Sequence, residues 1–339
     1  MSVQAVRIFD VTLRDGSHAI RHQFTPDQVR TIAAGLDAAG LFAIGVGHGD
    51  GLGGSSLQLG ISAFSDDALL GAAAETLERA LLAVTLVPGI GTKDHLRLAV
   101  ERGARIARIA THSTEADVAI QHIALARDLG IEVYGDLMMP HCNDPAGYAE
   151  QASIMEAAGA HGVYVMDSAG ALLPDDVSAR ISAMRSRLDQ TVLLGIHAHD
   201  NLSLAVANTL AAIDEGASLV DSCLGGLGAG AGNTRTEVVA AVLERRGIHT
   251  GLDLFALQDL ADQVVRPIAT PTIDRLTATL GYAAVPSSLL LPACRAAERF
   301  GIDPRDVLVE LGRRRAVTGQ DDLAGSIAAD LAAAGASHA

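Results

Sequence analysis

The stretch TVLLGIHAHDNLSLAVANTLAAIDEGASLVDSCL, residues 191–224, contains two β-rich runs with a helical segment between them. The runs TVLLGIHAH and SLVDSCL are nearly continuous in apolar residues, which is typical of parallel strands covered on both faces. The segment between them has apolar residues at helical spacing and ends at Gly216, where glycine readily takes the left-handed conformation of a helix end. The stretch therefore predicts a strand–helix–strand unit with parallel strands.

The same alternation extends over the first 250 residues. Six further β-rich runs precede this unit: VRIFDVTL, LFAIGV, LLAVTLV, RIARIA, IEVYGDLMM and GVYVM. Glycine marks four more helix ends, at Gly40, Gly103, Gly130 and Gly159. The alternative is a doubly wound open sheet, but no GxGxxG motif follows the first run. Eight strand–helix units in this length predict an α/β fold, a (β/α)8 TIM barrel over residues 1–250.

The β-rich runs stop after residue 250, and the remaining sequence has a helical pattern. Four segments show it: LDLFALQDLADQVV, SSLLLPACRAAERFG, PRDVLVELGRRR and DDLAGSIAADLAAAG. We therefore predict a second, smaller helical C-terminal domain over residues 251–339.

Charge and composition exclude several classes of protein. The net charge is −15 and the 25 basic residues form no long run, which argues against nucleic-acid binding because that requires clustered Lys and Arg. No apolar run approaches the roughly 20 residues of a membrane span, and the N-terminus lacks the layout of a signal peptide. The three cysteines are far apart and lack ligand spacing, as expected of free thiols in a reducing compartment. These features predict a soluble, cytoplasmic protein without nucleic-acid or membrane partners.

In a TIM barrel the functional residues follow the C-terminal ends of the strands. There His197 and His199 alternate along a strand, so both imidazoles point to one face and can bind one divalent metal. The alternative is that both are polar residues capping a barrel layer. A third, anionic ligand is best supplied by Asp15 after the first strand, because only the eighth strand separates the first from the seventh. The same donor set occurs in non-haem iron oxygenases, which are usually found on other folds.

Two neighbours of Asp15 are candidates for chemistry. Arg14 either forms a structural ion pair or stabilises negative charge on a substrate oxygen. His18 is a candidate general base, because the ordinary pKa of histidine is near neutrality. The glycine-rich GGLGAGAGN, residues 225–233, lacks the lysine of a phosphate-binding loop and is interpreted as a tight turn that closes the barrel. Further polar residues follow other strands: His48, Asp50, His141, Asp167 and Ser168.

Several long motifs resemble one known family. They are DVTLRDGSHAIRHQFT, HGDGLGGSS, LVPGIGT, ATHSTEAD, MDSAGAL, the His-x-His pair with NLSLAVANT, and GLGAGAGNTRTEVVAAVLER. Together they resemble the 4-hydroxy-2-oxovalerate aldolases, pyruvate-specific class II aldolases. These belong to a superfamily of metal-dependent lyases and synthases that includes HMG-CoA lyase and isopropylmalate synthase. The resemblance covers about residues 6–330, and His18 marks the aldolase branch.

The resemblance implies a cofactor, an activity and a partner. Asp15, His197 and His199 would bind Mn2+ or another divalent metal such as Mg2+ or Co2+. Arg14 would stabilise an enolate and His18 would accept a proton, while Ser168 and the neighbourhood of His197 would contact the pyruvyl end of the substrate. The reaction would cleave 4-hydroxy-2-oxo acids to pyruvate and an aldehyde, or form them. The C-terminal domain would contact an acylating aldehyde dehydrogenase, and the protein would be a hetero-oligomer or a homodimer.

Two positions depart from the family. In LGYAAVPSS, Pro286 stands where these aldolases have a tyrosine near C4 of the substrate, so we expect an altered aldehyde side of the pocket. Asp200, after the histidine pair, is more familiar from the lyases and synthases. Two alternatives therefore stay open: a Claisen-type acyl-CoA lyase or synthase, and a non-catalytic partner subunit of an aldehyde dehydrogenase.

Overall fold

A closed barrel of eight parallel strands in chain order confirms the predicted TIM barrel. The computed structural model describes residues 5–336. Its strands are β1 (Arg7–Asp10), β2 (Ala43–Gly45), β3 (Leu81–Leu86), β4 (Ile106–His112), β5 (Glu132–Met138), β6 (Gly162–Asp167), β7 (Leu193–Ala198) and β8 (Leu219–Ser222). Each of the eight β-rich runs falls on one strand, and β1 pairs with both β2 and β8 to close the barrel.

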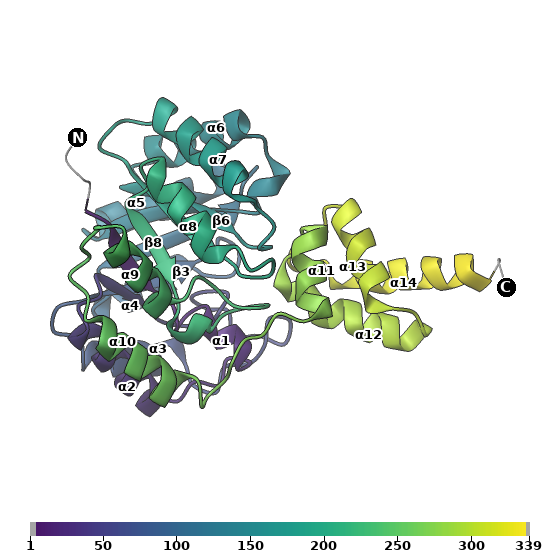
Figure 1. Ribbon diagram of the computed structural model, residues 1–339, viewed down its shortest axis with the longest axis horizontal. Coiled ribbons are helices and arrows are strands. Elements are labelled where there is room, and N and C mark those ends of the chain that lie inside the picture. Colours follow the sequence, from purple (N-terminus) through teal and green to yellow (C-terminus); the bar gives the residue numbers. More distant parts are fainter. Residues whose placement is uncertain (1–4, 337–339) are drawn as a thin grey trace.

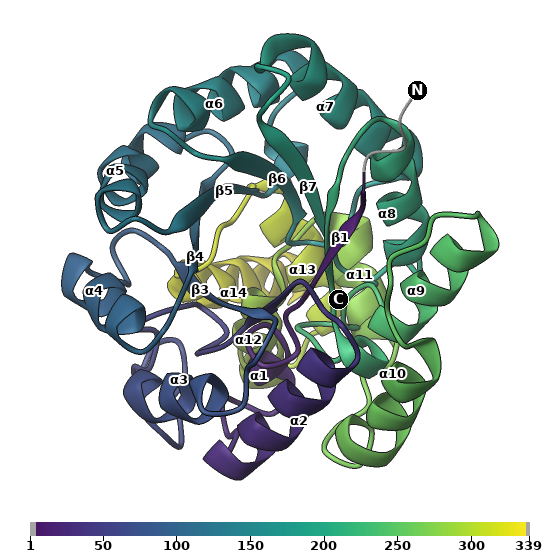
Figure 2. The same cartoon turned by 90° about the vertical axis from the view of Figure 1, so that its left-hand side faces the viewer.

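Helices follow the strands and form a ring around them (Figure 2). They are α1 (Gly16–Ala19), α2 (Pro26–Ala38), α3 (Asp66–Ala74), α4 (Lys93–Glu101), η1 (Ala116–Ala119), α5 (Ile120–Asp128), η2 (Pro140–Cys142), α6 (Pro145–Ala157), α7 (Pro174–Arg187), α8 (Ala205–Asp214), η3 (Leu224–Gly226) and α9 (Thr236–Arg245). The five glycines that the sequence analysis placed at helix ends all have φ between 73° and 101°. That conformation confirms their role as helix terminators, since a side chain would strain it.

Aromatic side chains fill the part of the barrel interior that lies away from the C-terminal ends of the strands. Phe9, Tyr134 and Tyr164 meet edge to face, with ring centroids 5.9–6.3 Å apart. Gly195 on β7 pairs in register with Tyr164 on β6, and its missing side chain makes room for the Tyr164 ring. The interior is therefore a packed core and not a pore.

The chain after the barrel is helical, as the sequence predicts. It forms α10 (Leu254–Leu260), η4 (Ala261–Val265), α11 (Arg275–Ala283), η5 (Ser287–Leu289), α12 (Leu290–Phe300), α13 (Pro304–Arg313) and α14 (Asp321–Ala336). α10 packs on α2 and α9, and it shares the core of the barrel with η4. α11, which the sequence analysis did not identify, joins α12–α14 around a second core. The boundary between residues 250 and 251 stays a prediction.

The second helical core lies at one end of the barrel (Figure 1). A Cβ atom on Gly281 of α11 would lie 2.6 Å from Leu202, in the loop after β7, and 2.9 Å from the carbonyl oxygen of Gly170, after β6. Ser287 lies against Gly230, in the loop after β8. The C-terminal helices therefore lie over the ends of the strands where TIM barrels place their sites.

Within residues 5–336, no helix combines the length and the apolar character that crossing a membrane requires.

Gly195→Ala tests the packing of the barrel interior. The new methyl group would lie 2.5 Å from the Tyr164 ring, which cannot move within the packed core. We expect the free energy of unfolding to fall by about 1–3 kcal/mol in urea denaturation, as for other overpacked cores. Gly71→Ala in α3 is the control, because its methyl group meets no atom within 4 Å and alanine favours a helix. Equal stability of the two variants would contradict this packing.

Candidate metal centre at the barrel rim

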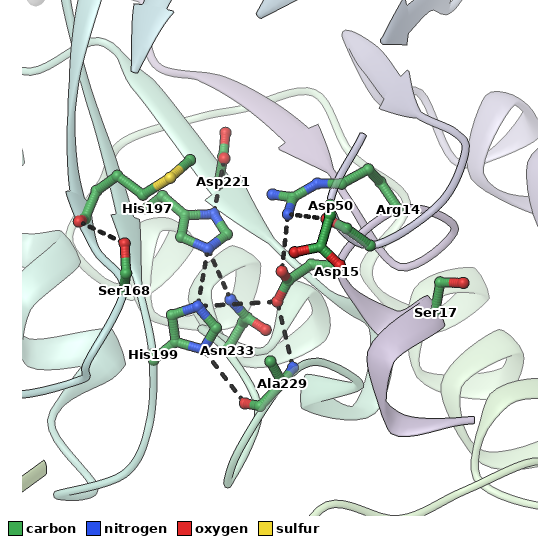
Figure 3. Close-up of polar contacts among 12 residues, drawn as sticks. Arg14, Asp15, Ser17, Asp50, Ser168, His197, His199, Asp221, Ala229 and Asn233 are labelled. Carbon is green, nitrogen blue, oxygen red and sulfur yellow. Dashed lines mark hydrogen bonds and ion pairs between the residues drawn. The ribbon is translucent and has the colours of Figure 1, made fainter. Parts of the chain in front are cut away.

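Two imidazoles at the end of β7 face each other (Figure 3). His197 Nδ1 lies 2.9 Å from Asp221 Oδ2 on β8, and His199 Nδ1 lies 3.2 Å from the carbonyl oxygen of Ala229. Because both acceptors are oxygens, each Nδ1 carries a proton, and in the neutral ring each Nε2 then carries a lone pair. The two Nε2 atoms are 3.2 Å apart. Two lone pairs at this distance repel each other unless a proton or a cation lies beside them.

Asp15 completes the cluster that the sequence analysis predicted. Its Oδ2 lies 3.9 Å from His199 Nε2, and the ligand atoms of Asp15, His197 and His199 all lie within 4.8 Å of one another. The carboxylate accepts hydrogen bonds from Arg14 Nη1 at 2.8 Å and from the backbone N–H of Ala229 at 3.3 Å. Two imidazole nitrogens and one carboxylate form a donor set that fits a divalent metal.

The protonation states of these groups suit a cation. Burial alone would raise the pKa of Asp15, but Arg14 and the neighbouring histidines outweigh it and lower that pKa. Burial lowers the pKa of His199 to about 4, so its imidazole is neutral at pH 7. Metal ligands must be deprotonated, so both residues are in the form that binds a metal without releasing a proton.

Asn233 joins the site although the sequence analysis did not identify it. Its Nδ2 donates to His197 Nε2 at 3.0 Å, and its Oδ1 is buried with no hydrogen-bond partner among residues 5–336. Turning the amide would direct Oδ1 toward the cluster, where an oxygen suits a cation better than an N–H group does. The only sequence signal is a carboxamide in the glycine-rich loop, which was interpreted as a turn that closes the barrel.

Arg14 is buried beside the cluster and has an unused donor. Its Nη1 donates to Asp15 and, at 3.3 Å, to the carbonyl oxygen of Gly49. Its Nε is buried without a partner among the described residues. The structural ion pair is thus present, and the role of Arg14 in stabilising a substrate oxygen stays a prediction. Both interpretations from the sequence therefore fit this arrangement.

His18 and Ser168 lie farther from the cluster. His18, in the short helix α1, is half-buried, and its ring packs against Gly49. Ser168, directly after β6, is half-buried and donates its hydroxyl to the carbonyl oxygen of Met166 at 3.2 Å. Figure 3 places Ser168 beside His197, on the side opposite Arg14. The structure thus brings all the predicted site residues to one rim.

Two further histidines support the position of His18. His22 and His48 stack with ring centroids 3.6 Å apart, and the His22 ring meets the His18 ring at 5.1 Å. Burial lowers the pKa of His22 to about 3, so it adds no charge at pH 7. Both rings contact the loop after β2, His22 at Leu59 and His48 at Gly60. The sequence could not predict this stack, because it joins residues from two separate loops.

Other polar residues at the strand ends have structural contacts. Asp200 accepts a hydrogen bond from the backbone N–H of Ala205, and Asp167 accepts from those of Ala171 and Leu172. These contacts shape the loops after β7 and β6. Within residues 5–336, neither carboxylate belongs to the two groups of possible metal ligands, which are Asp15 with His197 and His199, and His18 with His22 and Asp50.

Solved structures share the fold at low sequence identity. The carboxyl transferase domain of Rhizobium etli pyruvate carboxylase superposes with a TM-score of 0.80 at 18% identity, covering 96% of this chain and 60% of that chain. The N-terminal domain of a putative aldolase from Bacteroides vulgatus has a TM-score of 0.72 at 22% identity, covering 84% of this chain and 95% of that one. These likenesses concern the fold alone.

Sequence comparison gives closer relatives. Residues 5–264 match the HMGL-like family, and residues 271–333 match the DmpG-like communication domain. The 4-hydroxy-2-oxovalerate aldolase of Thermomicrobium roseum is 55% identical over 96% of this chain and 91% of that protein. The 4-hydroxy-2-oxovalerate aldolase of Roseiflexus sp. strain RS-1 is 54% identical over 97% of both chains. The chain therefore belongs to the HMGL-like family, together with the 4-hydroxy-2-oxovalerate aldolases.

Proposed function

We propose that this chain is a divalent-metal-dependent aldolase that cleaves 4-hydroxy-2-oxo acids to pyruvate and an aldehyde, or forms them in reverse. The observation that carries the proposal is the approach of two histidine Nε2 atoms to 3.2 Å beside the Asp15 carboxylate. The high identity to 4-hydroxy-2-oxovalerate aldolases over nearly the full chain supports the substrate class.

Asp15, His197 and His199 would hold the metal, with Mn2+ as the first candidate and Mg2+ or Co2+ as alternatives. A divalent cation there supplies Lewis acidity toward the carboxylate and keto oxygens of a 2-oxo acid. Arg14, whose guanidinium lies beside Asp15, would stabilise the oxygen on which negative charge develops. Ser168 and the neighbourhood of His197 contact the pyruvyl end of the substrate.

His18 acts as the general base of the cleavage. It removes the proton of the C4 hydroxyl while the bond between C3 and C4 breaks, so that the aldehyde leaves and an enolate remains. The electron pair of the broken bond stays with the enolate. A proton from water then adds at C3 to complete pyruvate, and His18 releases its proton to the solvent. In the condensation direction, the protonated His18 returns its proton to the new alkoxide.

The two alternatives have less support. Asp200 favours a Claisen-type lyase or synthase, but its carboxylate holds the backbone N–H of Ala205. A non-catalytic partner subunit requires the loss of an essential group, whereas all the proposed groups are present at one rim. The match to a DmpG-like communication domain supports an acylating aldehyde dehydrogenase as partner of the C-terminal helices. We further propose that the enzyme works in the cytoplasm.

Asp15→Asn tests the metal centre. The amide keeps the shape of the side chain but removes its charge, so we expect metal-stripped wild type to recover pyruvate release with Mn2+ and the variant not to. We expect kcat/KM to fall by more than about 100-fold, because replacing a residue that only supports a metal ligand already lowers metal affinity or activity by up to about 100-fold. Asp37→Asn, at a buried carboxylate paired with Arg79, is the matched control and should keep its activity. Full activity of the metal-stripped wild type would refute the proposal.

Gly49→Ala tests His18 without replacing it. The new methyl group would lie 2.5 Å from two carbons of the His18 ring, so the imidazole has to move. Displacing a reacting group by about 1 Å costs on the order of 100-fold, so we expect kcat to fall by about 10- to 100-fold while Mn2+ affinity stays unchanged. Gly71→Ala serves as the control again. An unchanged kcat in Gly49→Ala would argue against His18 as the base.

Pro286 is the basis for a proposal about specificity. It is buried at the start of η5, where the family tyrosine and its hydroxyl are missing. We expect wild type to add pyruvate to bulkier aldehydes, including aromatic ones, at rates comparable with those for acetaldehyde and propanal. Pro286→Tyr should shift the ratio toward the small aldehydes. If acetaldehyde and propanal clearly outrun all larger aldehydes in wild type, the altered-pocket hypothesis fails.

A further inference from the structure

We propose that Arg108, in the interior of the barrel, is a positioning residue of the metal centre that acts through Asp221 on His197. The inference rests on the metal centre of the proposed function and assigns a role to residues that no motif identified. It concerns how firmly the metal is held, not which substrate is cleaved.

Arg108 binds two carboxylates, one from the neighbouring strand and one from a strand across the barrel. On β4, its Nε donates to both oxygens of Asp136 on β5, at 2.9 and 3.1 Å. Its Nη1 donates to both oxygens of Asp221 on β8, at 2.8 and 3.0 Å. The guanidinium carbon lies 3.6 Å from the centre of the Tyr164 ring, which holds the guanidinium from one face. All three charged side chains are at most 3% exposed.

One oxygen joins this network to the metal centre. Asp221 Oδ2 accepts from Arg108 Nη1 at 3.0 Å and from His197 Nδ1 at 2.9 Å. Because Arg108 holds both oxygens, Asp221 cannot rotate away from His197. The imidazole is thereby fixed in its plane and in the tautomer that leaves Nε2 free for the metal. Carboxylate partners of metal-binding histidines have this effect on ligand orientation and basicity.

The charges of the network also favour a cation at His197. Arg108 is shared between two carboxylates, so the negative charge of Asp221 next to the imidazole is only partly compensated within the barrel interior. Burying such a charge is costly unless it is compensated, and a dication on the far side of the imidazole would compensate it.

Stability alone does not account for the network. Arg108 Nη2 and the Tyr164 hydroxyl are buried without partners among the described residues, and unsatisfied buried polar groups destabilise a fold. Replacing buried ion networks with packed apolar side chains is often neutral or stabilising. The network is therefore better explained by the positioning of Asp221 than by stabilisation of the barrel interior.

The test is the Mn2+ dissociation constant of metal-stripped protein, measured by titration calorimetry. Arg108→Lys keeps the charge but loses the planar fork that holds two carboxylates, so we expect Mn2+ to bind about 10- to 100-fold more weakly. Asp136→Asn should weaken binding in the same direction by a smaller factor. The matched control is Asp37→Asn, which removes a buried arginine-paired carboxylate with no connection to His197, and it should bind as wild type does.

A double variant separates positioning from a general structural defect. If Arg108 acts through Asp221, then Asp221→Asn and the combination Asp221→Asn with Arg108→Lys should have the same Mn2+ affinity. Additive losses, or wild-type affinity in both Arg108→Lys and Asp136→Asn, would overturn the inference. Should Arg108→Lys fail to fold, Asp136→Asn and Asp221→Asn decide, with Co2+ absorption spectra reporting the ligand geometry.

Asp15→Asn distinguishes the two proposals. If it binds Mn2+ as wild type does, the metal centre of the proposed function is wrong. If it loses Mn2+ while the Arg108 and Asp136 variants bind normally, only the positioning role is wrong.

Discussion

The hydrogen-bonded ladder between β1 and β8 closes the barrel, and every feature of the candidate site depends on it. The ladder places Phe9 opposite Asp221, so the loop that carries Asp15 emerges beside the strand that supports His197. The loop after β8 then contacts both sides of the centre through Ala229, whose N–H meets Asp15 and whose carbonyl oxygen meets His199. An open sheet with the same strands would leave these groups at its two distant edges.

Below the rim that carries the candidate metal centre, the barrel interior has a charged layer and, beneath it, an aromatic layer. Phe9, Tyr134 and Tyr164 form an apolar layer, and Arg108 with Asp136 and Asp221 forms the layer above it. The charged layer lies between the packed core and the histidines, where water cannot screen it. One end of the barrel interior is thus a packed aromatic core, and the other end holds the candidate metal centre. The C-terminal helices cover this second end.

Much of the fold was predictable because it is encoded in local patterns. Continuous apolar runs identify buried parallel strands, and glycine marks the helix ends. The predicted helical segments did not include α11, a helix of nine residues with Gly281 within it. The centre of the site was predictable for another reason. The TIM barrel places the C-terminal ends of all strands at one rim, so two histidines at the end of β7 and a carboxylate after β1 were expected to meet.

The sequence by itself determined the order of strands and helices, the family, and the residue types able to bind a metal. Only the tertiary structure decided which groups support them. Asn233, Asp221, Arg108 and the stacked His22 and His48 owe their roles to contacts between loops and strands that are distant in the chain. The physical reason is that period and propensity act over a few residues, whereas barrel register and loop packing set the distances across the barrel on which hydrogen bonds and metal ligation depend.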